Sequence, residues 1–150
     1  MSFQQRNVAV SLACFSGIMV IYLVSIFLLL RDGAFNETNV FRLWGVIIGL
    51  AVVVTILATI LTHIVSAVVE TIKTQKEAEV DDIKDERDTL IDLRGTKNTF
   101  LASSLGVFVA MLTFVFGQPP LVMFSLLIFF GVLAQIIGDT TRLVLYRRGV

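Results

Sequence analysis

Cysteine, histidine and proline are nearly absent from this chain, which has one Cys, one His and two Pro in 150 residues. A lone cysteine cannot form an intramolecular disulfide. One His and one Cys are too few for a Cys/His zinc site or a hydrolytic triad. The sequence has no glycine-rich phosphate-binding loop either. We therefore expect no catalytic residue, no metal site and no cofactor, and we predict that the chain is not an enzyme.

Charge is also scarce. Charged residues make up 16% of the chain and hydrophobic residues 56%, whereas soluble domains are about one quarter charged. A bilayer core about 30 Å thick needs about 20 apolar residues in a helix. Four stretches meet that length, the second interrupted only by His63, and we expect spans at 8–30, 43–69, 99–117 and 121–138. The fold class predicted is an all-α integral membrane protein with a single membrane domain, 1–150.

Positive charge is distributed unevenly between the two sides of these spans. Ten of the twelve Lys and Arg residues lie before residue 8, between 70 and 98, or after 138. The other two are Arg31 and Arg42, in the first connection between spans. Loops rich in Lys and Arg remain in the cytoplasm. We therefore expect a multi-pass protein of the plasma (inner) membrane with both termini in the cytoplasm.

Small residues recur where spans could approach one another closely. Lipid tails are as apolar as leucine, so close backbone packing favours the association of spans. The candidates are Gly45 and Gly49, Gly106 and Ala110, and Gly131 and Gly138. They are consistent either with packing inside one bundle or with contacts between protomers of a homo-oligomer, for which a dimer is favoured.

Residues 70–95 form the largest charged segment. Its first part lacks Pro and Gly, so the second span should continue into it as a helix. Residues 81–94 then predict a short amphipathic helix that ends at Gly95, and Thr96 or Asn98 could cap the next span. At 100° per residue, one face of the short helix carries an acidic stripe within about 40°. That stripe consists of Asp81, Asp85, Asp88 and Asp92.

The acidic stripe has several interpretations. It could form salt bridges with the carboxyl tail through Arg147 and Arg148, bind a soluble cytoplasmic regulator, or simply be solvated. Metal binding is disfavoured because carboxylates one turn apart spread along the axis, about 5–6 Å from each other. Direct nucleic-acid binding is not expected, because the segment carries more acidic than basic residues. The partner-binding set would be Asp81, Asp85, Glu86, Arg87, Asp88, Asp92 and Arg94.

The candidate functional polar residues within the spans or at their edges are His63, Gln135, Asp139 and Arg142. Charged groups at membrane depth are costly and usually have a partner. One hypothesis pairs His63 with Asp139 in a proton- or cation-sensitive site, since histidine titrates near neutral pH. In the other, Asp139 pairs with Arg142 on its own helix and His63 bonds a nearby carbonyl.

Two motifs resemble those of a known family. They are Asp85-Glu86-Arg87-Asp88-Thr89-Leu90-Ile91-Asp92-Leu93-Arg94, just before a span, and the ending Leu143-Val144-Leu145-Tyr146-Arg147-Arg148-Gly149. Together with the four-span layout, they are similar to small prokaryotic membrane proteins that form a family of unknown function. The resemblance implies no catalytic residue. It does imply that members are often encoded beside helix-turn-helix regulators.

Two functions remain. The first is a structural or regulatory membrane protein whose segment 81–94 engages a partner or the basic carboxyl tail. The alternative is a small homo-oligomeric transporter or channel that uses the polar residues near the cytoplasmic face. Four-span multidrug exporters place a carboxylate deep in their first span, and 8–30 has none. We therefore favour the structural or regulatory function.

Overall fold

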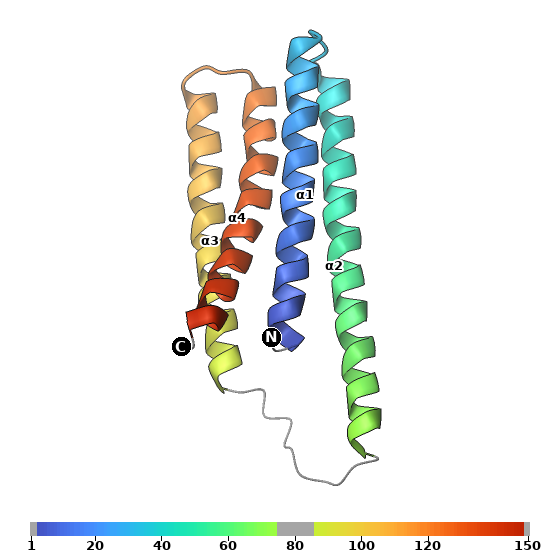
Figure 1. The fold of residues 1–150 in the computed structure, drawn as a ribbon. Coiled ribbons are helices and arrows are strands. Elements are labelled where there is room, and N and C mark those ends of the chain that lie inside the picture. Colours follow the sequence, from blue (N-terminus) through green and yellow to red (C-terminus); the bar gives the residue numbers. More distant parts are fainter. Residues whose placement is uncertain (1–2, 75–85, 149–150) are drawn as a thin grey trace.

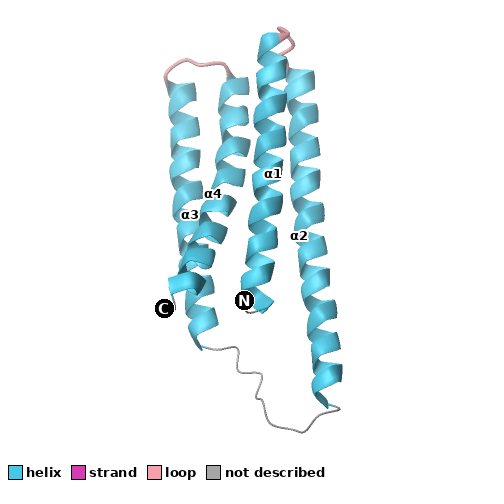
Figure 2. Ribbon diagram, in the orientation of Figure 1, coloured by secondary structure: helices cyan, strands magenta, loops and turns pink. Residues whose placement is uncertain are grey.

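The computed structural model contains four helices joined in sequence, α1 (Phe3–Arg31), α2 (Glu37–Thr74), α3 (Glu86–Val115) and α4 (Pro120–Arg148). Figure 2 shows these helices and their short connections, with no strand among the described residues. The structure describes residues 3–74 and 86–148, with side chains for 4–57, 60, 64 and 87–148.

All four helices are long and apolar enough to cross a membrane. They contain 29, 38, 30 and 29 residues, whereas a span needs about 20. Each helix is therefore longer than the stretch expected from hydropathy alone, although α3 ends two residues before the expected end at 117. Between 11% and 22% of each apolar window is buried inside the protein, so most of the apolar side chains face outward. An outward apolar surface on every helix is what lipid requires, and the chain is an all-α, multi-pass membrane protein.

The helices form an open four-helix bundle in the order α3, α4, α1, α2 (Figure 1). Within the described residues, α4 lies between α3 and α1, and α2 contacts α1 and, more weakly, α4. In the same part of the chain, α3 contacts neither α1 nor α2. Both chain ends lie at one end of the bundle, here called the termini end. The opposite end, with the connections 32–36 and 116–119, is called the loop end.

Glycines in a left-handed conformation end two of the helices at the loop end. Gly33 follows α1 with φ 64°, and Gly117 follows α3 with φ 79°. Residues with side chains rarely adopt this conformation, and it lets the last carbonyls of a helix accept hydrogen bonds from the residues that follow. Pro120 then starts α4, where a missing N–H costs nothing. The connection between α3 and α4 is therefore short, and the two helices form a tight hairpin.

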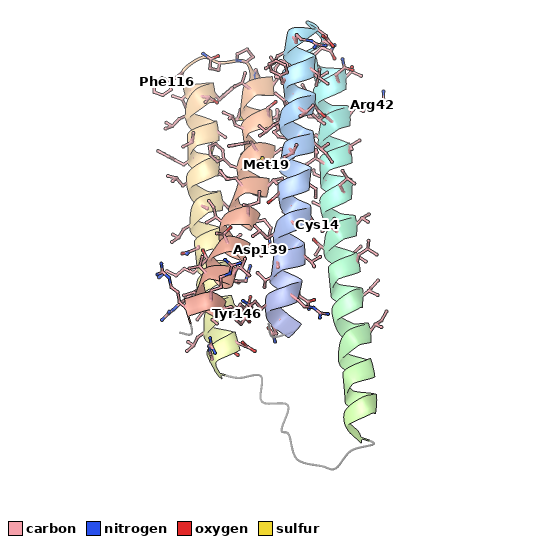
Figure 3. All side chains as sticks on the ribbon, viewed as in Figure 1. Cys14, Met19, Arg42, Phe116, Asp139 and Tyr146 are labelled. Atoms are coloured by element: carbon pink, nitrogen blue, oxygen red, sulfur yellow. The ribbon has the colours of Figure 1, made fainter. Side chains whose placement is uncertain are left out.

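The core lies between α1, α4 and the first half of α2. Its buried residues are Phe15, Ile18, Met19, Tyr22, Ile47, Ile128 and Val132. Met19 lies between α1 and α4 in Figure 3. The Tyr22 hydroxyl donates a hydrogen bond to the carbonyl of Ser125, which satisfies a polar group that would otherwise be costly in lipid. The central pair α1 and α4 therefore holds the two hairpins together.

The predicted break at Gly95 is wrong, because α3 runs without interruption from Glu86 to Val115. Gly95 is buried within this helix, and a Cβ there would overlap the Arg142 side chain of α4. The glycine is thus needed for a close helix crossing and not for a helix end. Asn98 does not cap a helix start either, because its side-chain amide donates to the Thr141 hydroxyl of α4. Residues 81–85 of the predicted short helix lie outside the described residues.

The small residues divide into two groups. Gly106 and Gly138 are buried in the α3–α4 interface, where a Cβ would overlap Phe130 and Thr99 respectively. Ala110 on α3 is also buried, with no exposed surface. The remaining three are Gly45, Gly49 and Gly131, and each is exposed, so that an added Cβ would have no described atom within 4 Å. Close packing inside the bundle therefore accounts for the first group only.

Candidate functional site

A buried carboxylate near the termini end is the centre of the most polar site in the bundle. Asp139 of α4 is 3% exposed, and it is the one buried charged residue among those described. The Ser11 hydroxyl of α1 donates to its Oδ2 at 2.6 Å. Its Oδ1 accepts from Gln135 Nε2 at 3.3 Å and from Arg142 Nη1 at 3.0 Å. Both oxygens are therefore satisfied. Figure 3 marks Asp139 at the start of the last turns of α4.

Arg142 connects this buried carboxylate to α3. Its Nε donates to Asp92 Oδ1 at 2.9 Å, and its Nη2 donates to the Thr96 hydroxyl at 2.9 Å. The Arg142 side chain is 15% exposed and that of Asp92 is 72% exposed. A planar guanidinium with five donors suits such a branched arrangement. We call the set Asp139, Arg142, Asp92, Ser11, Gln135 and Thr96 the ion network.

The ion network crosses the boundary of the hydrocarbon layer. Asp139 lies nineteen residues after Pro120 on α4, which is about 28 Å along the axis at 1.5 Å per residue. Asp92 lies twenty-three residues before Val115 on α3, which is about 34 Å. The hydrocarbon core is about 30 Å thick. By these lengths, Asp139 is at the edge of the lipid tails on the side of the termini end, and Asp92 is at headgroup level.

Further polar contacts surround the ion network at the same end. Tyr146 donates to Gln4 Oε1 of α1 at 3.3 Å, and its hydroxyl also interacts with the Asp88 carboxylate of α3. Together with the Asn98–Thr141 bond, these contacts join α1, α3 and α4 at several levels. Tyr146 is labelled close to the last turn of α4 in Figure 3. The termini end of these three helices is thus held mainly by polar contacts, whereas the centre of the bundle is apolar.

The geometry is typical of a structural contact that joins α1, α3 and α4, and less typical of a reactive centre. Two carboxylates share one guanidinium, and neutral donors from Ser11, Gln135 and Thr96 complete the set. Within the described part of the chain, no group of three or more His, Cys, Asp or Glu side chains could hold a metal ion. Buried charges that are paired and hydrogen-bonded are tolerated, but removing one partner leaves a costly unpaired charge.

The acidic stripe is only partly visible, and its partners differ from those predicted. Asp81 and Asp85 lie outside the described residues, as does the side chain of Glu86, which begins α3. Asp88 and Asp92 face the last turns of α4. Within this chain, Asp92 pairs with Arg142 and Asp88 interacts with Tyr146, not with Arg147 or Arg148. Pairing of the stripe with the carboxyl tail of a neighbouring copy stays a prediction.

Helix geometry explains this difference. Asp139, Arg142 and Tyr146 follow one another at three and four residues, so they share the face of α4 that meets α3. Arg147 and Arg148 fall on other faces and are exposed. No salt bridge joins either of them to a described residue. The carboxyl-terminal part of α4 does meet the acidic segment, but through Arg142 and Tyr146.

The structure tests one of the two hypotheses for the intramembrane polar residues. Asp139 does pair with Arg142 three residues along its own helix. His63 is on α2, but its side chain lies outside those described, so the proposed pair with Asp139 stays a prediction. Gln135 is one turn before Asp139 and donates to it.

Ser11 and Thr96 are members of the ion network that the sequence does not reveal. Each is a single hydroxyl residue with no charged pattern to distinguish it, and such residues commonly bond their own helix backbone in membrane spans. Depth in the membrane is the signal that could identify Ser11, which lies twenty residues before the end of α1 at Arg31. That is about 30 Å, which matches the depth of Asp139. Thr96 is one turn after Asp92 and thus on the same face of α3.

The first turns of α3 expose their leucines. Leu90 is 55% exposed and Leu93 is 64% exposed, whereas Ile91 between them is 2% exposed. An amphipathic surface helix normally packs its apolar face against the protein. Here the acidic face and Ile91 turn toward the bundle, because Arg142 and Tyr146 supply polar partners there. The open face of this segment therefore carries Leu90, Leu93 and the exposed Arg94.

Comparison of the whole chain with protein-family models, with curated proteins and with solved structures gives no match. The resemblance to small prokaryotic four-span membrane proteins therefore rests on the two motifs and the layout of spans. Its two motifs lie at and beside the ion network, because they supply Asp88 and Asp92 on α3 and Tyr146 on α4.

Proposed function

We propose that this chain is a structural or regulatory protein of the prokaryotic plasma (inner) membrane, with both termini in the cytoplasm. In this proposal the acidic segment 81–94 is engaged by the carboxyl-terminal part of α4 and holds a partner-binding surface at the membrane. The observation that carries it is the chain of ion pairs from Asp92 through Arg142 to Asp139. The termini end carries most of the Lys and Arg, which supports a cytoplasmic location.

The first turns of α3 extend beyond the membrane as a rigid helix, which supports a role in binding a partner. About twenty residues before Val115 suffice to cross the bilayer, so Glu86–Gly95 extends beyond the hydrocarbon by about 14 Å. This extension has no helix break, and Arg142 fixes it to α4. A helix held in this way loses little conformational entropy when a partner binds.

The free face of the extension indicates where a soluble partner would bind. Asp88 and Asp92 already have partners on α4, Tyr146 and Arg142, although the Asp92 side chain stays 72% exposed. Leu90, Leu93 and Arg94 are exposed on the other side. Exposed apolar residues beside a cation are typical of interaction surfaces. The family resemblance favours a soluble cytoplasmic regulator as the partner.

A pull-down in mild detergent tests this proposal with two variants. Leu90→Ser combined with Leu93→Ser should remove the co-purifying partner, and the thermal midpoint should stay within a few degrees because both leucines are exposed. The second variant, Asp85→Lys with Asp88→Lys, tests docking through the acidic residues. Equal recovery of every partner by wild type and both variants would eliminate the docking proposal.

A homo-oligomer, with a dimer favoured, is part of this proposal. Gly45 and Gly49 form a GxxxG pair on the exposed face of α2. Lipid offers small residues no packing advantage, so an exposed pair favours a second helix as its neighbour. The described residues of this chain supply no such helix on that face.

Transport is the alternative function, and the burial of Asp139 is the observation that favours it. A carboxylate at the edge of the hydrocarbon beside Gln135 is a feature of proton and cation pathways. Asp139→Asn should then abolish ion or drug flux in liposomes containing the purified protein. Flux that is unchanged by this substitution, or an absence of flux in wild type, would contradict transport. The complete set of donors around Asp139 favours the structural function instead.

A further inference from the structure

An apolar groove of about 400 Å³ runs between α1 and α2 near the loop end. From α1 it is lined by Ile21, Ser25, Leu28 and Leu29, and from α2 by Asn39, Arg42, Leu43 and Val46. It is open on its outer side. None of these residues belongs to the ion network, which lies at the opposite end of the bundle.

The groove changes in polarity along its length. The two helices are antiparallel, so if Ile21 is level with Val46 at the deep end, Ser25 is level with Arg42, and Leu28 is level with Asn39 near the shallow end. Ile21 and Leu29 are eight residues apart on α1, which is about 12 Å. The deep end is therefore apolar, and the polar groups lie from the middle of the groove to the end that reaches the membrane surface.

Arg42 supplies an unpaired cation at the shallow end. Its side chain has no hydrogen-bond or salt-bridge partner among the described residues. The other basic residue at the loop end, Arg31, differs because its Nε donates to Asp32 Oδ1 at 2.9 Å. Figure 3 labels Arg42 at the loop end of α2. Asn39 is held in place by its own bond to the Ala34 carbonyl at 2.9 Å.

We propose that this groove binds a phospholipid, with one acyl chain between α1 and α2 and the phosphate on Arg42. A ligand with an anionic head and an apolar chain matches the groove in the sign of charge, in polarity along the membrane normal and in access from lipid. The guanidinium is the preferred side chain for phosphate because it offers several donors in one plane.

The unpaired cation distinguishes a phospholipid from a second protein helix as the occupant. A phospholipid brings an anionic phosphate for Arg42 and an acyl chain for the apolar lining, and it can enter from the open outer side. A second helix satisfies its own backbone groups in lipid, but it supplies no phosphate for Arg42.

Native mass spectrometry of the delipidated full-length protein, titrated with phosphatidylglycerol, tests the head-group contact. Arg42→Gln should weaken the first binding event about tenfold, because hydrogen bonds to a charged group are lost. The matched control Arg31→Gln should leave it unchanged, since Arg31 is exposed at the same end but lies outside the groove. A diacylglycerol with the same chains and no phosphate should bind wild type and Arg42→Gln equally.

A second pair of variants tests the acyl-chain contact. Ser25→Trp places a large side chain in the groove and should abolish the first binding event. Val24→Trp introduces the same side chain at the neighbouring position, which is 52% exposed and does not line the groove, so binding should persist. The proposal is overturned if Arg42→Gln and Arg31→Gln bind the lipid equally, or if the two Trp variants do. Thermal midpoints of all variants establish that the bundle remains folded.

Discussion

Arg142 is the residue on which the termini end of the bundle most depends. Its three nitrogens contact Asp92, Thr96 and Asp139, and only 15% of its side chain is exposed. Exposed ion pairs stabilise proteins by about 0–1 kcal/mol. The pair with Asp139 differs because this carboxylate is buried. Without Arg142, its negative charge would stay buried and unpaired, and that cost to stability exceeds the attraction between the two groups.

We expect Arg142→Gln to destabilise the protein by about 3 kcal/mol, because Asp139 keeps its burial and loses the cation paired with it. The measurement is unfolding in a mixed micelle titrated with denaturing detergent. Arg148→Gln, at an exposed position of the same helix, should change stability by less than about 0.5 kcal/mol.

A double variant separates the loss of charge pairing from the loss of packing. Adding Asp139→Asn to Arg142→Gln removes the unpaired charge, so at least half of the lost stability should return. If the double variant is as unstable as Arg142→Gln alone, burial of the carboxylate is not the source of the effect.

Half of the ion network is predictable from sequence. The spacing of Asp139 and Arg142 places them on one helix face, so a local pair between them follows from helix geometry. Ser11 and Asp92 join the network from other helices. Their positions depend on how far each helix is shifted along its neighbour, and no local pattern encodes that shift.

At the scale of helices, the contact of α3 with α4 depends on glycines that leave room for side chains. Gly138→Ala should destabilise the protein by about 1–3 kcal/mol, the usual cost of an inserted methyl group in a packed interface. The added methyl would overlap Thr99 and lie 3.3 Å from the Gly95 carbonyl. Thermal unfolding in detergent measures this loss.

Gly131→Ala provides a matched control on the same helix. Gly131 is seven residues earlier and has nothing described within 4 Å of the added methyl, so alanine should be neutral or slightly stabilising because of its higher helix propensity. Combining Gly138→Ala with Thr99→Ala should restore part of the stability. A similar effect of Gly131→Ala and Gly138→Ala would contradict this description of the interface.

The error at Gly95 shows a limit of local patterns. A glycine after a charged, helix-forming run is typical of a helix end, and the same residue also permits two helices to approach closely. The sequence alone does not distinguish these roles. Arg142, forty-seven residues later in the chain, decides between them by crossing over Gly95.

We expect the exposed face of α2 to form the dimer interface. Gly49→Ile should leave the thermal midpoint of the monomer nearly unchanged, because the position is exposed. The same substitution should lower the dimer fraction in chemical cross-linking of native membranes, because a bulky side chain separates the two backbones. Cross-linking that is equal in wild type and Gly49→Ile would exclude this face as the dimer interface.

For the whole molecule, hydropathy predicts the number of spans well and their arrangement poorly. Length and apolarity are local properties, so four membrane-spanning helices follow directly from 8–30, 43–69, 99–117 and 121–138. The lateral order α3, α4, α1, α2 depends on small contacts such as Tyr22 with the Ser125 carbonyl. Such contacts contribute little to any hydropathy average.

The orientation in the membrane can be tested with single cysteines after Cys14→Ser. In intact cells, a membrane-impermeant thiol reagent should label Gln118→Cys at the loop end and should not label Arg94→Cys at the termini end. Permeabilised cells should give labelling at both positions, since both residues are exposed. Labelling of Arg94→Cys in intact cells would reverse the proposed sidedness and remove the cytoplasmic partner.

The order of the helices also predicts that the protein can be cut between α2 and α3 and still assemble. The connection between α2 and α3 joins the two outermost helices, which do not contact each other among the described residues. A cut between Thr74 and Glu86 therefore separates two hairpins without interrupting any helix or contact that the structure describes. Co-expressed fragments 1–74 and 86–150 should reassemble through α1 and α4, and the second fragment alone should be inserted but less stable. The protein would then behave as two hairpin modules, each a candidate for exchange or fusion.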